Sequence, residues 1–515
     1  MSDSREQQLE EANKQLQQEN KLLKQKIDLL IQRMHGKSSE KIAPDQLDFL
    51  LNHTDELGKP NGDASQKTEN AVAKPKKQRG KRQKPRLPEH LPVESREELL
   101  PQAFIDHPEQ WKRIGEVVSE QLDYQPGHFF KRQLIRPKFV HLERRHEPPI
   151  IAPLPNRWTE RCIATPALQA HIAISKFADH LPLYRQEQIF KTRYDVHIPR
   201  NTMSRWMDYV AESLRLIYLC MAEQLVAGDY LQVDETPIKY LEPGAGQAQK
   251  GFFWAYSNPK GDVLFDWRTS RGHECLLEML KKPSQSGNTD EPIIYYQGLL
   301  QCDGYSAYKT LISKVSGIEL AACWAHVRRK FKEALKSAPK EAGWIMIQIQ
   351  HLYRIEKKLR DQEAGPRFRE SKRQSESKPI VNRIKKVLML YKARPSILPK
   401  SALGIAVGYA LGEWEELEVY LREGRVEIDN NLVENAIRPT AVGKKNWLFI
   451  GGAETGDRSA IIFSIIESCR RRGIDPHAYL TDVLERIPDA TNRDIKNLTP
   501  AAWAKASRAR QLVAA

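Results

Sequence analysis

The sequence predicts a multidomain α/β protein in which a mixed β-sheet in the middle of the chain is flanked by helical segments. Three observations predict this class. Short apolar stretches with a period of two, separated by turn residues, run from about Gly228 to Trp324. About 100 residues from His326 to Arg425 then have a helical period, and the first 35 residues contain a seven-residue leucine repeat. At 515 residues the chain is long enough for two to four domains.

Composition is typical of a soluble protein with real hydrophobic cores, since 40% of residues are hydrophobic and 29% are charged. The longest apolar stretch, Ala402 to Leu411, is about half the length of a membrane-spanning helix. The polar N-terminus has no signal-peptide pattern, so we expect a cytoplasmic protein without a membrane partner. The six cysteines form no CxxC pair, which favours reduced, mostly buried thiols over a disulfide framework or a zinc site.

The net charge favours an anionic partner. Lysine and arginine total 81 against 66 acidic residues, a formal charge of +15. A basic surface attracts polyanions, of which nucleic acid is the leading candidate. Charge alone would also fit a ribosomal partner or an anionic membrane surface.

Residues 1–42 are expected to form a coiled-coil zipper. Leucines recur every seven residues, at Leu9, Leu16, Leu23 and Leu30. The companion core positions are Asn13, Asn20, Ile27 and Met34, and buried asparagines there favour a parallel pair of helices in fixed register. We therefore expect a homodimer or a larger assembly on DNA. The alternative is a single solvated amphipathic helix.

A linker and a small domain are expected next. Residues 43–90 read as a basic flexible linker, because Lys74 to Arg86 has eight basic residues in thirteen and no acid. Such a run could neutralise DNA phosphates or serve only as a solubilising tether. Residues 91–160 look like a small mixed domain, with alternation over Phe130 to Val140 that suggests strands.

Residues 161–225 are expected to be helical and to include a DNA-binding helix-turn-helix. A helix over Leu183 to Thr192 is followed by a short break, and Pro199 is a good start signal for a second short helix. That second helix would be the recognition helix and offers the polar residues Arg200, Asn201, Thr202, Ser204 and Arg205. A helical hairpin with no role in DNA binding is the alternative.

Residues 226–465 should form the catalytic core. The expected order is three strands, Tyr230 to Leu241, Gly251 to Ser257 and Val263 to Arg268, then a helix, a strand over Gly298 to Cys302, a helix, and a strand over Ile318 to Trp324. Three antiparallel strands followed by helix, strand, helix and strand is the order of the RNase H-like fold.

The rest of the chain is expected to be mainly helical. A helical insertion covers 326–425, with a polar interruption at Glu363 to Lys378. A helix then opens over Asp429 to Arg438, with Asp429 as its N-cap, and another spans Thr455 to Arg472. Residues 466–515 form a basic, helical C-terminal segment.

Three carboxylates on different elements are the candidate active site. Phosphodiester chemistry with divalent metal ions needs several acids that converge on one point. Asp234 lies in the first strand, near Pro237, where we expect the strand to bend or end. Asp303 follows the fourth strand, which should lie beside the first, and Glu434 lies one turn into its helix. By spacing alone, Glu427, Asp429 and Asp457 compete with Glu434 for the third place.

Several motifs together resemble the DDE transposases of the insertion-sequence-66 family. They are VDET around Asp234, CDGY around Asp303, CWAHVRRKF from Cys323, DNNLVENAIRP and GKKNWLFIGG after Asp429, and SCRRRGIDPHAYLTDVL from Ser468. The resemblance covers about residues 20–490. It implies an RNase H-like core, a catalytic and metal-binding triad of Asp234, Asp303 and Glu434, and dependence on Mg²⁺, for which Mn²⁺ could substitute.

The resemblance also implies the reaction and its partners. The protein would cleave DNA at the terminal inverted repeats of a bacterial insertion sequence, and the freed 3′-hydroxyl would attack target DNA. The resemblance suggests that the protein acts at the nucleoid, together with accessory proteins of the same element. Two groups of basic residues could hold phosphates. Arg328 and Arg329 follow the fifth strand, and Arg438, Lys444 and Lys445 follow Glu434.

One feature departs from the family pattern. Members usually have a cysteine-pair zinc segment at the place of residues 91–160, but this chain has no cysteine before Cys162. His107, His141 and His146 alone are weak evidence for a metal, so no zinc is expected. Two other functions remain open: a structure-specific nuclease that cuts without joining, and a non-catalytic DNA-binding regulator.

Overall fold

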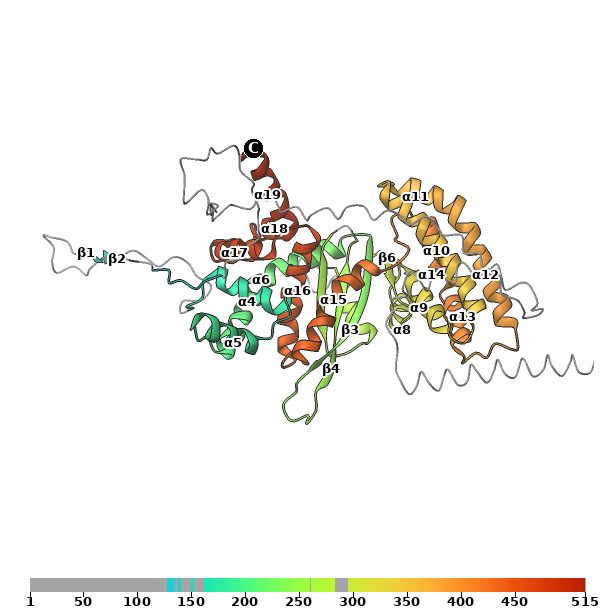
Figure 1. Cartoon of the computed structure of the whole chain (residues 1–515). Helices are drawn as coiled ribbons and strands as arrows, with labels where there is room; N and C mark the ends of the chain where they lie inside the picture. Colours follow the sequence, from blue (N-terminus) through green and yellow to red (C-terminus); the bar gives the residue numbers. More distant parts are fainter. Residues whose placement is uncertain are drawn as a thin grey trace, which may run out of the picture. The chain divides into compact units, whose positions relative to one another are not determined.

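A five-stranded mixed sheet is the centre of the chain in the computed structural model (Figure 1). The structure describes residues 127–133, 135, 138–139, 150–151, 162–259, 261–282 and 295–514. The predicted zipper, the basic linker and nearly all of the small mixed domain lie outside these ranges. The chain divides into a unit at 52–135, of which only 127–133 and 135 are described, and a second unit made of the rest. The five-stranded sheet and its helices belong to the second unit.

The strand order is β5-β4-β3-β6-β7. The strands are β3 (Tyr230–Tyr240), β4 (Gln249–Ser257), β5 (Val263–Arg268), β6 (Gly298–Cys302) and β7 (Ile318–Ala322). The pairs β3–β4 and β4–β5 are antiparallel, whereas β3–β6 and β6–β7 are parallel. From Gly251 to Ser257 every residue of β4 is buried, so the sheet is covered on both faces at this strand. The sequence predicted these elements in this order.

Helices connect and cover the strands. The connections inside the sheet are α7 (His273–Met279) and α8 (Ser306–Lys314). Helix α16 (Glu454–Arg471) packs along β5 and against α6 (Arg200–Val226), and α15 (Asn431–Trp447) packs on β3 and β4. Helices α4 (Pro166–Phe177) and α5 (Leu183–Tyr194) precede α6, and the chain ends with α17 (Pro476–Arg486), η3 (Ile487–Asp489), α18 (Ile495–Leu498) and α19 (Pro500–Ala514). The domain boundary expected at 465 falls inside the continuous helix α16.

The helical insertion packs against the other edge of the sheet, beside β7. Its elements, yellow to orange in Figure 1, are α9 (Trp324–Ala334), α10 (Pro339–Asp361), α11 (Pro366–Lys372), the π-helix η2 (Arg373–Ser377), α12 (Lys378–Ala393), α13 (Ala402–Gly412) and α14 (Trp414–Arg422). Their buried side chains form one hydrophobic cluster with residues of β3, β6 and β7. Indole Nε1 of Trp324 donates a hydrogen bond to the carbonyl of Leu417 at 3.2 Å, which ties α9 to α14.

Several local predictions were wrong. Only Glu363 to Gly365 interrupt the helices of the insertion between Glu363 and Lys378, because the remaining polar residues form α11 and η2. Among the described residues of Phe130 to Val140, only Lys138–Phe139 (β1) are in a strand, paired with Ile150–Ile151 (β2). Helix α6 is 27 residues long rather than short, and Pro199 is its N-cap rather than its first residue.

Pro237 does not end β3, which continues to Tyr240. The reason is that β6 pairs with β3 only as far as Gln232, so the missing N–H of Pro237 interrupts no ladder on that side. Beyond this point the edge is covered by the chain after α15. Ile450 N–H donates to the carbonyl of Lys239 at 2.9 Å, and Leu241 N–H donates to the carbonyl of Gly451 at 2.7 Å.

Candidate active site

Asp234 and Asp303 are brought together by adjacent parallel strands. The last paired residues of β3 and β6 are Gln232 and Gln301, and each aspartate lies two residues further along its chain. Side chains two residues apart in a strand share a face. The two carboxylates therefore follow the face on which Gln232 and Gln301 lie, as expected from the strand order.

Buried polar side chains attach the segment before α15 to this same face. Tyr230 Oη accepts a hydrogen bond from Glu427 N–H at 3.0 Å and donates one to Gln301 Oε1 at 2.6 Å. Gln301 Nε2 donates to the carbonyl of Glu427 at 2.8 Å, and Gln232 Nε2 donates to the carbonyl of Asp429 at 3.0 Å. All three side chains are buried, where an unmade hydrogen bond is costly. This attachment fixes the position from which α15 starts.

Glu434 lies in the first turn of α15. Its carboxylate oxygens face two side chains of α9: His326 Nε2 is 3.7 Å from Oε1, and Arg329 Nη2 is 3.5 Å from Oε2. Helix α9 follows β7 directly, so the sheet places this pair of side chains beside the start of α15. Arg329, predicted as a phosphate contact, thus faces the third carboxylate.

The three acids that competed with Glu434 all have other partners. Glu427 forms ion pairs with Arg369 at 2.9 Å and Arg360 at 3.3 Å. Asp429 accepts hydrogen bonds from the backbone N–H and the side-chain amide of Asn431. It precedes the N-cap position, which Asn430 occupies, so the expected cap is shifted by one residue. Asp457 pairs with Arg215 at 3.0 Å.

The site concentrates negative charge. Burial raises the pKa of Asp234 well above its ordinary value, and the nearby carboxylates of Glu235, Glu434 and Asp303 raise it further. The hydrogen bond that Asp234 Oδ1 accepts from Glu235 N–H at 2.9 Å acts in the opposite direction. The charges of Glu434 and Asp303 both act on Asp234, as expected if the three carboxylates converge.

Behind the site, a group of side chains that the sequence analysis missed supports both aspartates. Glu235 is buried on the opposite face of β3 and accepts hydrogen bonds from Arg271 Nε at 2.7 Å and Tyr308 Oη at 3.0 Å. The Arg271 guanidinium lies over the ring of Tyr305, 3.8 Å from its centre. Tyr305 N–H in turn donates to Asp303 Oδ1 at 3.0 Å. The one available signal was a second acid directly after Asp234 in an apolar strand.

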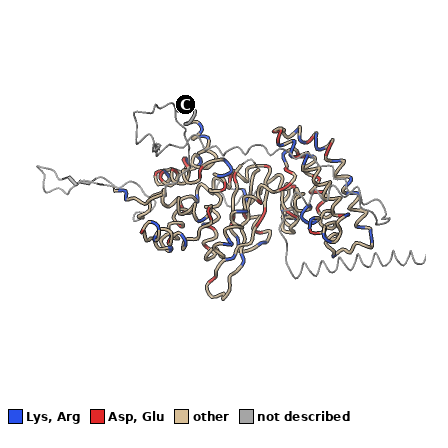
Figure 2. Tube along the Cα trace, in the orientation of Figure 1, with Lys and Arg blue, Asp and Glu red and all other residues tan. Residues whose placement is uncertain are grey.

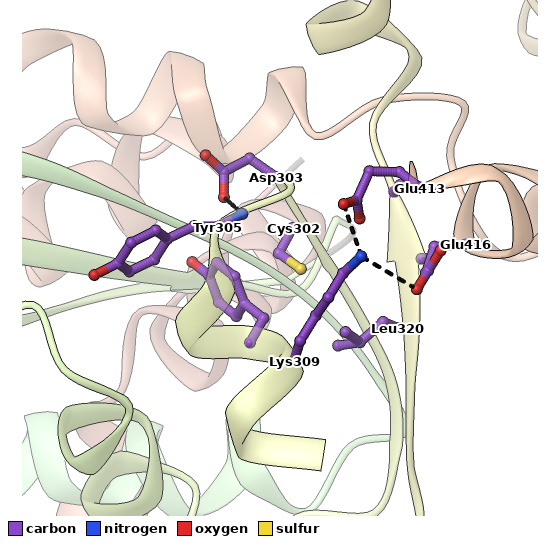
Figure 3. Close-up of a pocket in the computed structure, with 10 residues that line it drawn as sticks. Cys302, Asp303, Tyr305, Lys309, Leu320, Glu413 and Glu416 are labelled. Carbon is purple, nitrogen blue, oxygen red and sulfur yellow. Dashed lines mark hydrogen bonds and ion pairs between the residues drawn. The ribbon is translucent and has the colours of Figure 1, made fainter. Parts of the chain in front are cut away.

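The helical insertion contacts the loop of Asp303. Gly304 N–H donates to the hydroxyl of Tyr409, on α13, at 3.2 Å. A small pocket beside this contact holds an ion pair, with Lys309 Nζ 2.8 Å from Glu413 and 4.0 Å from Glu416. Figure 3 shows Lys309 pointing toward both glutamates. The insertion therefore takes part in positioning the second aspartate.

Replacing Gly304 by alanine is expected to reduce the metal-dependent DNA cleavage that the sequence predicts by about 10- to 100-fold, the usual cost of disturbing a residue that orients a metal ligand. A Cβ at this position would lie 2.8 Å from the ring of Tyr409 and 3.1 Å from Glu413, so the loop must move. The matched control is Gly408→Ala on α13, where a Cβ meets nothing within 4 Å. Equal cleavage rates for both variants would contradict the prediction.

Oxygen atoms of carboxylates are the donors at this site, which suits a hard divalent ion such as Mg²⁺. In the described part of the chain, no Lys or Arg forms an ion pair with Asp234 or Asp303. A second donor set shares Glu434: ligand atoms of Cys323, His326 and Glu434 lie within 4.8 Å of one another. Cys323 Sγ is buried and accepts a hydrogen bond from Asn430 N–H at 3.4 Å. Burial raises the pKa of that thiol, and its hydrogen bond ties it to the start of α15.

The remaining predicted phosphate contacts fall into two groups. Arg438 and Lys445 are exposed on α15, whereas Lys444 is half-buried and lies 3.3 Å from the carbonyl of Pro237 and 3.5 Å from Thr236 Oγ1. Thr236 shares a strand face with Asp234. Arg328, on α9, is half-buried. The structure thus brings Lys444 near the carboxylates along β3.

The predicted recognition residues lie at the start of α6. Arg200, Asn201 and Arg205 are exposed and Thr202 is half-buried. The preceding helix α5 adds further basic residues in its last turn, visible in Figure 2. Further along α6, Arg458 of α16 donates to the carbonyl of Ser204 at 3.1 Å and pairs with Asp208 at 2.5 Å, which fixes α6 against α16. The role of these residues in DNA binding stays a prediction.

Comparisons with known proteins cover most of the chain. The family model described as "Transposase IS66 family" matches residues 161–458, "IS66 C-terminal element" matches 464–501, and "Transposase C of IS166 homeodomain" matches 22–96.

Relatives of similar length occur in Sinorhizobium fredii. The protein named "Uncharacterized protein y4jD" is 35% identical over 402 residues, 76% of each chain. "Uncharacterized protein y4qI" is 34% identical over 73% of this chain and 68% of its own length. "Uncharacterized protein y4hP" is 29% identical over 78% of this chain and 73% of its own length. Given the family match over 161–458 and these relatives, the chain belongs to the IS66 family of transposases.

Proposed function

We propose that this protein cleaves DNA at the ends of an insertion sequence and joins the freed 3′-hydroxyl to target DNA, with Asp234, Asp303 and Glu434 as its active site. The observation that carries the proposal is that Asp234 and Asp303 follow the last paired residues of adjacent parallel strands, and that the backbone leading to Glu434 is hydrogen-bonded to the same strands. Burial and neighbouring carboxylates also raise the pKa of Asp234. Such perturbed groups cluster at functional sites. The sheet order β5-β4-β3-β6-β7, antiparallel and then parallel, supports an RNase H-like core.

The three carboxylates would hold Mg²⁺, for which Mn²⁺ could substitute. When bound, the cation would activate the attacking oxygen and stabilise the leaving oxygen of the phosphodiester. The residues of this chain supply the geometry: Asp234 and Asp303 come from adjacent strands, and Glu434 comes from a helix whose start is fixed to the same strands. Arg329 and His326 hold the Glu434 carboxylate from the α9 side.

The other parts of the chain have proposed roles in DNA recognition. We propose that residues 1–42 pair protomers, that 43–90 neutralise phosphates and that 161–225 bind the terminal inverted repeats. The match of residues 22–96 to a transposase segment supports a role for the N-terminal part in transposition. Among the described residues, no helix is both long and apolar enough to cross a membrane, and DNA is the proposed partner.

A plasmid assay tests the function. We expect the protein, with Mg²⁺ and a donor plasmid bearing the terminal repeats that flank the gene, to produce joined products, and Asp303→Ala and Glu434→Ala each to abolish them. Asp457→Ala is the matched control, because Asp457 is an acid near the site in sequence whose partner is Arg215. Nicks without joining would favour a nuclease, and binding without breakage a regulator. Full strand transfer by Glu434→Ala would show that the third carboxylate is misassigned.

A further inference from the structure

Two large apolar side chains are exposed where the chain leaves α15. Leu448 is 67% exposed and Phe449 is 42% exposed, and Leu241 beside them on the end of β3 is 41% exposed. Leu448 also has an unusual backbone, with φ 61° and ψ −44°. A positive φ is an outlier for a bulky residue. Phe449 N–H donates to the carbonyl of Trp447 at 2.7 Å, so Leu448 is the centre of a tight γ-turn of the rare, strained kind.

The turn is held firmly on both sides. Before it, Leu448 N–H donates to the carbonyl of Lys444 at 3.0 Å, and after it, Ile450 N–H donates to the carbonyl of Lys239 at 2.9 Å. The carbonyl of Ile450 accepts a hydrogen bond from Thr455 Oγ1 at 3.0 Å. The strain at Leu448 is therefore imposed by helix α15 and strand β3 together, and it keeps an apolar side chain in water. Strain that the surrounding structure imposes in this way is typical of functional sites.

The surroundings of the turn are basic. Lys445 is exposed on the last turn of α15, and Lys444 lies beside it. An apolar tip flanked by cations is complementary to DNA, whose phosphates are anionic and whose stacked bases are apolar.

The position of the turn along β3 sets its distance from the carboxylates. Lys239 lies five residues beyond Asp234 on β3, or about 17 Å at roughly 3.4 Å per residue. Bases along one DNA strand are also spaced by about 3.4 Å. We consider a duplex that lies along β3 with one phosphate at Asp234. It would meet the turn about five base steps from that phosphate.

We propose that Leu448 and Phe449 form an apolar wedge that enters between bases of the DNA about five base pairs from the phosphate at Asp234, while Lys444 and Lys445 contact the adjoining phosphates. The proposal rests on the proposed function for the location of that phosphate. Apolar wedges of this kind unstack a base step and kink the duplex. The wedge would thereby fix the register of the DNA end relative to the carboxylates.

Fluorescence of 2-aminopurine, which rises when a base is unstacked, tests the wedge. The base is placed singly at successive positions in duplexes of the DNA that flanks the gene, and the full-length protein is added in EDTA so that no chemistry is needed. We expect a rise confined to positions around five base pairs from the cleavage site. Leu448→Ser/Phe449→Ser should abolish the rise and weaken binding by about 5- to 150-fold, the range that base stacking contributes.

Two further variants exclude trivial explanations. Leu448→Gly removes the side chain and relieves the positive φ, so it should keep the melting temperature and lose the signal. Leu390→Ser is the matched control, because Leu390 is 61% exposed on α12 between Lys386 and Lys392, and it should leave the signal unchanged.

The wedge would be overturned if the wild-type protein gave no localised rise in fluorescence, or if the double variant gave an equal rise. A substitution that changed the oligomeric state of the DNA-free protein would also overturn it, because the patch would then be a contact between copies. A localised, Leu448-dependent rise in a protein that never cleaves DNA would keep the wedge and reject the proposed chemistry. Cleavage with no such rise would do the reverse.

Discussion

Asp234→Asn should abolish DNA cleavage and strand transfer, by on the order of 10³-fold or more, and at the same time make the protein more stable. Asparagine keeps the shape of the side chain and loses the charge that a divalent ion needs. In the metal-free protein that charge is unfavourable, because Asp234 is buried beside Glu235, Glu434 and Asp303. Removing this repulsion should therefore raise the Tm of the metal-free protein.

The pH dependence of this gain follows from the direction of the pKa shift. The pKa of Asp234 is raised in the folded protein, so well below the ordinary aspartate pKa of about 3.9 the carboxyl is protonated in both states and does not destabilise the fold. As the pH rises through the folded-state pKa, the folded protein loses stability relative to the unfolded chain. The two proteins should therefore melt alike in acid, and the asparagine variant should melt higher at neutral pH.

Asp266→Asn is the control for this experiment. Asp266 is a buried aspartate of β5 whose pKa is raised to about 6 by burial, but it pairs with Arg268 at 2.8 Å and is not one of the three acids. Its substitution should leave cleavage near the wild-type rate. Activity retained by Asp234→Asn, or a melting temperature lowered at neutral pH, would contradict the assignment of Asp234 as a strained metal ligand. Differential scanning calorimetry with and without Mg²⁺ measures the stability part.

The strands of the sheet, and the positions of the two aspartates along them, could be predicted because they depend on local sequence patterns. Alternation from Tyr230 and turn residues before Val263 locate strands within one or two residues. Asp303 follows directly because it ends a strand that the order places beside β3. The behaviour of Pro237 could not be predicted, since it depends on where β6 stops pairing, at Gln232.

The surroundings of the carboxylates depend on contacts between residues far apart in the chain. Glu235 accepts hydrogen bonds from Arg271 and Tyr308, which are 36 and 73 residues away in the sequence. The residues around Glu235 form no pattern that predicts these partners. Only the family resemblance identifies Glu434 as the third carboxylate. The structure adds a physical reason, because Tyr230, Gln232 and Gln301 bind the backbone that leads into its helix.

The polar segment that was expected to interrupt the helices of the insertion instead contains a buried cluster of charged side chains. Arg373, fully buried in the π-helix, forms hydrogen bonds with both carboxylate oxygens of Glu356 at 2.7 Å each, and with the carbonyls of Tyr420 at 2.7 Å and Glu423 at 3.1 Å. Arg369 also reaches Glu356, at 3.2 Å. In the sequence, these charged residues interrupt the helical period and therefore resemble a solvated loop. In the structure they are buried, because their partners on α10 and α14 satisfy their charges and hydrogen bonds.

Replacing Glu356 by alanine is therefore expected to lower the free energy of unfolding by about 3–5 kcal/mol, because Arg373 would be left buried without a counter-charge and Arg369 would keep only Glu427. The urea midpoint followed by circular dichroism measures the loss. The matched control is Glu376→Ala in the same π-helix, whose pair with Lys372 at 3.0 Å is exposed and should contribute less than about 1 kcal/mol.

Glu356→Met combined with Arg373→Met separates the buried charge from the packing around it. Methionines of similar volume need no counter-charge, so this double variant should recover much of the stability lost by Glu356→Ala. Arg369 also pairs with Glu427, whose backbone is bonded to Tyr230 and Gln301, so cleavage should recover together with stability if the insertion holds the start of α15 in place. A loss below about 1 kcal/mol in Glu356→Ala, no larger than the exposed control, would show that the buried cluster contributes little to holding the insertion together.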